Sequence, residues 1–137
     1  MISFFCEDID FKYINPQKAI DWLEKSIQSE FKNSGELNFI FCSDEFLIKM
    51  NNEYLDHDTY TDIITFNYVE NNMISGDLFI SIDRVKENAE ANDVSFITEL
   101  NRVMIHGILH LIGYDDKTAS DAQQIRAKED FYLALQS

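Results

Sequence analysis

Two histidines, a glycine and an aspartate near residue 110 have the types and spacing of a metal site. His106 and His110 are four residues apart, so in a helix they lie on one face with about 6 Å between their Cβ atoms. That separation allows both imidazoles to bind one metal ion. Gly113 can adopt a positive φ, end the helix and turn the chain back, so that Asp116 approaches the same ion.

Two imidazoles and one carboxylate leave a coordination position for water, which is typical of a catalytic rather than a structural zinc site. A single histidine on an apolar helix face is more often a core residue, but the pair with the following glycine and carboxylate favours a metal. Asp115 could compete with Asp116 for the third position. We therefore predict one zinc ion per chain, bound by His106, His110 and a carboxylate that is Asp116 or its neighbour Asp115.

The helix that carries the histidines is predicted to begin near Ser95 and to end before Gly113. Its polar stripe also holds Glu99 and Arg102, at offsets that place both on the histidine side. Both are therefore candidates for a role at the same site. The alternative for Arg102, a surface salt bridge with Glu99, remains open.

The elements around this helix indicate an α/β (α+β) fold, a small mixed β-sheet packed with several helices. Strands are predicted at residues 2–6, 37–42, 61–68 and 76–82, with the last two forming an antiparallel hairpin around a turn at Asn71 and Asn72. Helices are predicted at residues 16–31, from 44 to about 54, from Asp83 as N-cap to about 92, and from Thr118 as N-cap to about 135.

Length and composition favour a single domain over residues 1–137, with 45% hydrophobic and 26% charged residues. Cys6 and Cys42 have no metal-ligand spacing and are expected to be reduced, as in a cytosolic protein. We expect a soluble cytoplasmic protein, because we find neither a signal peptide nor a run of the roughly 18 apolar residues that a membrane span requires. The net charge of −14 means that any contact with nucleic acid must be local, metal-assisted or mediated by a partner.

Three segments together resemble one known family. The sequence His-Gly-Ile-Leu-His-Leu-Ile-Gly-Tyr-Asp at residues 106–115 resembles the signature of the YbeY family, bacterial endoribonucleases of ribosomal RNA maturation and ribosome quality control. Residues 51–66, which end in Thr-Asp-Ile-Ile-Thr-Phe, and Gly-Asp-Leu-Phe-Ile-Ser at residues 76–81 are similar to two further stretches of that family. The resemblance implies a mixed sheet with a zincin-like metal helix and a zinc ion held by three residues.

Carried over by residue, the family ligands fall on His106, His110 and Asp116, where the family usually has a third histidine. A carboxylate is a competent zinc ligand at about 2.0–2.2 Å. It makes the site one unit less positive, which predicts a slightly less acidic bound water and a shifted preference towards harder ions.

The family also commonly has an arginine that serves activity where this chain has Leu55, and Arg102 is a candidate to bind a substrate phosphate in its place. His57 and Arg84 are weaker candidates, because surface placement explains both.

The resemblance implies a metal-dependent, single-strand-specific endoribonuclease acting in 16S ribosomal RNA 3′-end maturation, with the ribosomal small subunit and ribosome-associated proteins as partners. The alternatives are a zincin-like hydrolase of another substrate and a non-catalytic ribosome-assembly factor with a bound metal. Residue 107 is glycine, where His-Glu-x-x-His peptidases have their base, which is the main argument against a peptidase. Glu99, Asp62 and Asp77 are possible general bases, although a turn or strand-end role is the default for Asp62 and Asp77. Tyr114 is a candidate substrate contact, because its place between the helix end and Asp116 puts it close to the metal.

Overall fold

A four-stranded mixed sheet forms the base on which the helices pack. The computed structural model describes residues 1–55 and 61–136, with the side chains of Tyr54 and Leu55 outside the description. The strands are β1 (Ile2–Cys6), β2 (Asn33–Cys42), β3 (Ile63–Asn67) and β4 (Met73–Ser81), in the order β1-β2-β4-β3. β1, β2 and β4 are parallel, and β3 runs antiparallel to β4, as the predicted hairpin requires.

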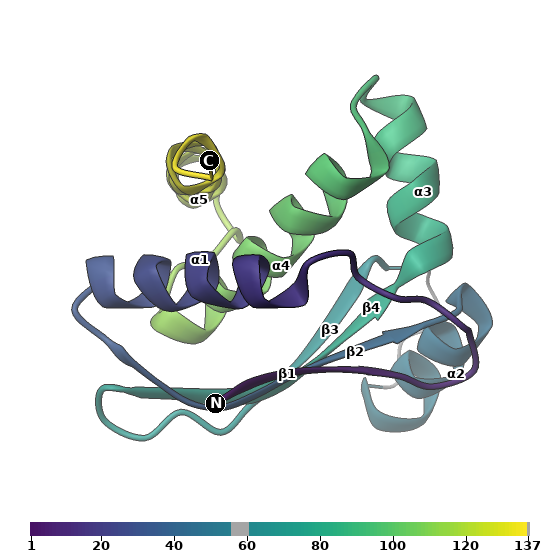
Figure 1. Ribbon diagram of the computed structural model, residues 1–137, viewed down its shortest axis with the longest axis horizontal. Coiled ribbons are helices and arrows are strands. Elements are labelled where there is room, and N and C mark those ends of the chain that lie inside the picture. Colours follow the sequence, from purple (N-terminus) through teal and green to yellow (C-terminus); the bar gives the residue numbers. More distant parts are fainter. Residues whose placement is uncertain (56–60, 137) are drawn as a thin grey trace.

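The described helices lie on both faces of this sheet (Figure 1). Their bounds are α1 (Pro16–Ser29), α2 (Asp44–Leu55), α3 (Ile82–Ala91), α4 (Phe96–Ile112) and α5 (Ala119–Ala134). In the view of Figure 1, α1, α4 and α5 lie above the sheet and α2 lies below one end of it. The predicted fold class, a small mixed sheet with several helices, is confirmed.

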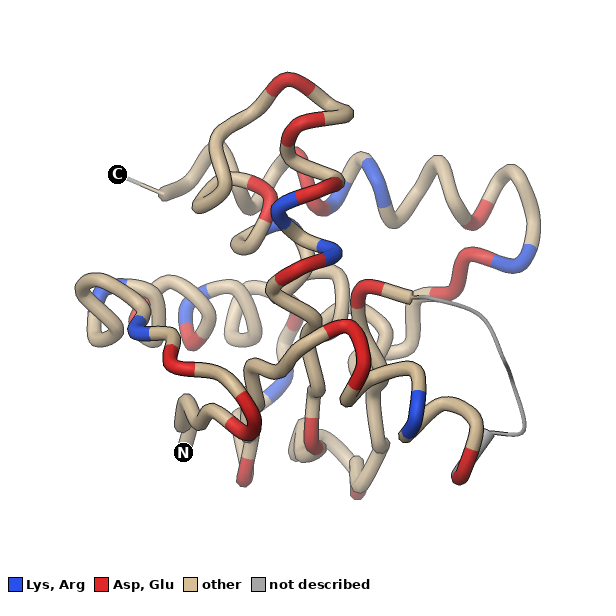
Figure 2. Tube along the Cα trace, turned by 90° about the vertical axis from the view of Figure 1, so that its right-hand side faces the viewer, with Lys and Arg blue, Asp and Glu red and all other residues tan. Residues whose placement is uncertain are grey.

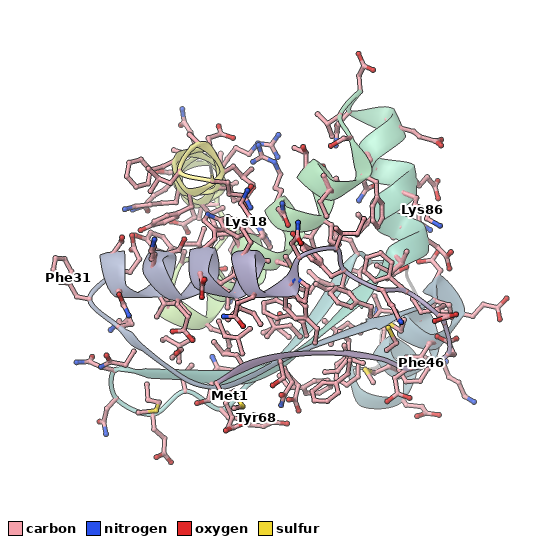
Figure 3. All side chains as sticks on the ribbon, viewed as in Figure 1. Met1, Lys18, Phe31, Phe46, Tyr68 and Lys86 are labelled. Carbon is pink, nitrogen blue, oxygen red and sulfur yellow. The ribbon has the colours of Figure 1, made fainter. Side chains whose placement is uncertain are left out.

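Alternating side chains give the sheet two apolar faces of unequal size. On the larger face, Leu78 and Ile80 of β4 pack with buried residues of α1, α4 and α5. On the other face, Ile64 of β3 and Leu47 of α2 form a small second cluster. Phe46 of α2 packs against this cluster and stacks with Phe79, and Figure 3 shows it on the lower side of the sheet.

Several predicted element boundaries are wrong: β3 is shorter than the predicted 61–68, and β4 begins at Met73 rather than at residue 76. Backbone pairing explains the boundary between α1 and β2. α1 ends at Ser29 rather than at Phe31, which has a φ of 61°, and residues 33–35 begin β2 because Asn33 pairs with Met73. The N-cap of α3 is Ser81, whose hydroxyl accepts a hydrogen bond from the Arg84 amide at 3.1 Å.

Asp83, predicted to cap α3, instead accepts a hydrogen bond from the Asp44 amide at 2.9 Å and so satisfies the first turn of α2. Both interactions satisfy amide donors that a helix start leaves without intrahelical partners.

Carboxylates are spread along the whole visible trace in Figure 2 rather than gathered on one face. Within the described ranges, no helix combines the length and the apolar content that crossing a bilayer requires.

Candidate metal centre

The helix that carries the histidines lies directly against the sheet. α4 begins at Ser95, whose hydroxyl accepts a hydrogen bond from the Thr98 amide at 3.2 Å, as the sequence predicts. Gly107 faces the sheet, because a Cβ at this position would lie 2.5 Å from Leu78 Cδ2 and 2.8 Å from Ile63 Cδ1. The absence of a side chain at residue 107 therefore allows α4 to approach β3 and β4 closely.

The chain reverses at Gly113 and returns along the histidine face. Gly113 has a φ of 126°, a conformation that L side chains rarely adopt, as predicted from its position after the helix. The amides of Gly113 and Tyr114 both donate to the carbonyl of Leu109, at 3.1 and 3.0 Å, and satisfy the end of α4. This turn brings Asp116, three residues later, beside the histidines.

His106, His110 and Asp116 present one ligand atom each to a common point. The Nε2 atoms of the two histidines are 3.0 Å apart, and Oδ2 of Asp116 lies 3.7 Å from His106 Nε2 and 3.5 Å from His110 Nε2. The point equidistant from these atoms is about 2.0 Å from each, which matches a zinc–nitrogen or zinc–oxygen bond length. Within the described residues, these three could hold a metal ion.

A buried carboxylate on α5 sets the orientation of His106. Glu129, with a side chain 5% exposed, lies with Oε2 2.5 Å from His106 Nδ1, and its Oε1 accepts a hydrogen bond from Arg102 at 2.9 Å. A proton on Nδ1 leaves the Nε2 lone pair facing Asp116 and His110, as in the carboxylate–histidine–metal arrangement.

The opposite charges of Glu129 and its partners His106 and Arg102 favour the charged form of each residue. Burial raises the pKa of Glu129, but the hydrogen bonds from His106 and Arg102 outweigh burial and hold that pKa below its usual value. Burial lowers the pKa of His106, but Glu129, Asp62 and Asp116 outweigh this and raise the pKa overall.

Arg102 points to α5 rather than to Glu99. Its guanidinium pairs with Glu129 at 2.9 Å and with Asp130 at 2.7 Å, and its side chain is 18% exposed. The alternative of a salt bridge with Glu99 is wrong for this structure, because the packing of α5 supplies two better-placed carboxylates. Glu99 itself is 6% exposed.

The other proposed acid–base residues separate into one near the metal group and one far from it. Asp62 lies close enough to His106 for their charges to interact, and burial raises the pKa of its carboxyl despite that interaction. Asp77 instead accepts a hydrogen bond from Asn38 at 3.0 Å, and it lies on the face of β4 opposite Leu78 and α4.

The remaining candidates are engaged elsewhere or are not described. The Tyr114 hydroxyl donates to Glu30 at 2.7 Å, at the end of α1. Arg84 pairs with Asp44 and Glu87. His57 and the side chain of Leu55 lie outside the described residues.

The metal group is open to solvent. The side chains of His106, His110 and Asp116 are 25%, 29% and 47% exposed, so that a fourth ligand can approach from outside. A groove of about 880 Å³ between α1, the start of α4 and the end of α5 contains none of these residues. A large substrate would therefore reach this group at the surface rather than through that groove.

Sequence reasoning missed Glu129 and Glu30, which contact His106 and Tyr114 respectively. Each is far along the chain from the residue it contacts, and nothing in its local sequence distinguishes it from the other carboxylates.

Comparison with known proteins shows one family and one fold. A family model described as Endoribonuclease YbeY matches residues 5–136. A relative from Flavobacterium johnsoniae, named Endoribonuclease YbeY, is 53% identical over 98% of this chain and 96% of its own length. One of the same name from Amoebophilus asiaticus is 50% identical over 96% of this chain and 90% of its own length. The solution structure of TM1509 from Thermotoga maritima is 27% identical, with a TM-score of 0.69, over 97% of this chain and 87% of that one.

Proposed function

This chain belongs to the YbeY family of endoribonucleases, and from that premise we propose that it is a metal-dependent, single-strand-specific endoribonuclease. Its substrate would be ribosomal RNA, in 16S 3′-end maturation and ribosome quality control in the cytoplasm. Residues 1–137 would act as a single domain. The observation that carries the proposal is the meeting of His106 Nε2, His110 Nε2 and Asp116 Oδ2 around one point about 2.0 Å from each.

We propose zinc as the resident ion, held by those three residues. When bound, it supplies a Lewis acid for a phosphoryl oxygen and acidifies a water molecule, and its positive charge would partly offset the charge of −14. Glu129 holds a proton at His106 Nδ1, so that Nε2 keeps its lone pair for the metal. Arg102 keeps Glu129 ionised by pairing with it.

We propose Arg102 as a positioning residue that acts through Glu129, in place of the phosphate-binding role expected from the sequence. Both of its ion pairs would have to break before it could bind a phosphate. Glu99 stays a predicted base, although its burial limits its access to a substrate. Asp62 is better placed to act as a base, because it lies near His106. The substrate contact predicted for Tyr114 would use its ring edge or its backbone, since its hydroxyl binds Glu30.

Exposure of the ligands favours a polymeric substrate. An RNA strand can lie across side chains that are between a quarter and a half exposed, whereas a buried site would admit only small molecules. Because the chain is acidic, the binding energy must come from the metal and from the ribosomal small subunit or its associated proteins. We propose these as the partners.

The two other candidate functions have less support. A peptidase of the His-Glu-x-x-His type needs a glutamate at residue 107, but a side chain there would collide with Leu78 and Ile63. An assembly factor with a structural zinc would be expected to have four protein ligands. The described residues provide three.

The test is the zinc content of the purified protein, paired with cleavage of a 16S ribosomal RNA precursor before chelation, after chelation and after zinc is restored. We expect one zinc per chain and cleavage that is lost and regained with the metal. Zinc without cleavage of free or subunit-bound RNA would refute the nuclease proposal and favour the assembly role. A protein that binds no zinc would refute the metal centre itself.

A further inference from the structure

At the end of α1 the charged residue Glu30 is largely buried and the apolar residue Phe31 is exposed, the reverse of what their polarity favours. The side chain of Glu30 is 10% exposed, whereas Phe31 is 89% exposed and projects outward in Figure 3. Burial of a carboxylate is unfavourable unless it is paired and hydrogen-bonded. The hydrogen-bond partners of Glu30 should therefore explain why its carboxylate is buried.

Glu30 is bound by three donors from two other segments. The hydroxyl of Tyr114 donates to Oε1 at 2.7 Å, and Lys128 Nζ and the hydroxyl of Tyr132 both donate to Oε2, the lysine at 3.1 Å. Burial raises the pKa of Glu30, but these donors outweigh burial and lower the pKa, so that the group remains a carboxylate.

The segments that carry these donors are the ones that complete the metal group. Tyr114 lies two residues before Asp116, in the connection from α4 to α5. Lys128 and Tyr132 lie on α5 beside Glu129 and one turn beyond it. The carboxylate of Glu30 therefore attaches both the loop of the third ligand and the helix of the carboxylate that orients His106 to the end of α1.

We propose that Glu30 is a positioning residue of the metal centre, acting through Tyr114 on Asp116 and through α5 on Glu129. The inference rests on the proposed function, because it requires that His106, His110 and Asp116 bind a metal. Metal–ligand distances tolerate only about 0.2 Å of error, so that a small shift of this loop weakens binding. Asp116 depends on the attachment most, because its side chain is 47% exposed and it lies in the connection between α4 and α5, whereas both histidines are held by α4 itself.

The test compares Glu30→Gln with Glu24→Gln. Glu24 is a matched control on the same helix: its Oε2 accepts a hydrogen bond from the Ser34 hydroxyl at 2.6 Å, which joins α1 to β2 and not to the metal group. A glutamine at residue 30 has one carbonyl oxygen for three donors. We expect Glu30→Gln to weaken zinc binding about 10-fold, the lower end of the range for residues that bond a ligand directly, because Glu30 acts through Tyr114 and α5; Glu24→Gln should leave it unchanged.

Zinc affinity is measured by competition with a chromophoric chelator, on samples shown to be folded by circular dichroism. Urea unfolding measures stability separately, because a merely structural role would lower stability in both variants and leave the zinc affinity of the folded protein unchanged. Tyr114→Phe removes one hydroxyl and keeps the ring, and it provides the test if Glu30→Gln does not fold. Tyr114→Phe should also weaken zinc binding. The fold-loss of zinc affinity in the double variant should be smaller than the product of the fold-losses in the two single variants.

Wild-type zinc affinity in folded Glu30→Gln or folded Tyr114→Phe would overturn the positioning role and leave the proposed function standing. Equal losses in Glu30→Gln and Glu24→Gln would also overturn it, because the effect would then be one of α1 as a whole. If the wild-type protein bound no zinc, the proposed function would fail, and this inference with it.

Discussion

Glu129→Gln should weaken zinc binding without removing any metal ligand. The carboxylate of Glu129 accepts at both oxygens, from His106 Nδ1 and from Arg102 Nη1. An amide has one oxygen and one NH₂ group, so a glutamine can satisfy only one of these donors. If its oxygen faces Arg102, its NH₂ faces Nδ1 and favours the tautomer with the proton on Nε2, the atom that should bind zinc.

The expected magnitude follows from the role of such partners in metal sites. Loss of a hydrogen-bonding partner beyond the ligands typically costs about 10- to 100-fold in metal affinity, or about 1.4–2.7 kcal/mol. Because Glu129 is 5% exposed and its bonds to His106 and Arg102 are both charge-assisted, we expect a value in the upper half of this range. Folding stability should also fall, by about 1–3 kcal/mol, because a buried donor loses its acceptor.

Asp130→Asn is the matched control. Asp130 also pairs with Arg102, at 2.7 Å, but its side chain is 60% exposed and makes no contact with His106 that the structure shows. This exposed pair should contribute less than about 1 kcal/mol to stability, and its loss should leave zinc affinity within about twofold of wild type.

The assay is chelator competition for zinc at pH 7.5, with the tautomer of His106 followed by nitrogen-15 NMR of the metal-free protein. We expect Nδ1 to be protonated in the neutral wild-type ring and this preference to weaken in Glu129→Gln. If Glu129→Gln bound zinc as tightly as Asp130→Asn does, the argument that Glu129 prepares His106 would be refuted.

Three further outcomes are expected. His110→Ala should lose stoichiometric zinc yet remain folded, by metal analysis and circular dichroism, since His110 is a partly exposed residue; unchanged zinc would show that the ligand assignment is wrong. Asp116→His should retain or tighten zinc binding in chelator competition, because a third imidazole is an equally good ligand, and a loss of metal would place Asp116 outside the site. Zinc binding requires a neutral His106, and the pKa of that residue is raised above 6.5. As the pH is lowered, zinc affinity should therefore start to fall while the pH is still above 6.5, by up to about tenfold per pH unit. A zinc affinity that does not change between pH 8 and pH 6 would contradict this.

The same raised pKa has the opposite consequence for the metal-free protein. Protonated His106 beside Glu129 contributes stability that is fully present below pH 6.5 and is lost as the pH rises through the raised pKa. Urea unfolding of the metal-free protein across this range should show the loss in wild type and a smaller loss in Glu129→Gln.

Local rules account for much of the metal group. The four-residue spacing of His106 and His110 defines one helix face, and a glycine after the helix predicts the positive φ that Gly113 adopts. The short connection that follows limits how far Asp116 can lie from the histidines. Ser95 and Thr118 were predictable as N-caps because their side chains bond amides only three residues away.

Predictions were wrong where local candidates competed with partners from other elements. Asp83 has the right type and place to cap α3, but Ser81 takes that role because it directly precedes Ile82, and the Asp83 carboxylate accepts from the first amide of α2 instead. Arg102 could have paired with Glu99 one turn away, but α5 brings Glu129 and Asp130 to it from 27 and 28 residues further along the chain.

The sequence by itself determined the ligand types, their spacing on one helix and the turn that returns a carboxylate to them, because each depends on neighbours within about ten residues. Only the tertiary structure decided which carboxylates support them. Glu129 reaches His106 because α5 packs on α4, and Glu30 reaches Tyr114 across 84 residues because α1 ends beside that turn. With 25 acidic residues in the chain, periodicity cannot select these two, since their burial and their hydrogen-bond partners arise only when the helices pack.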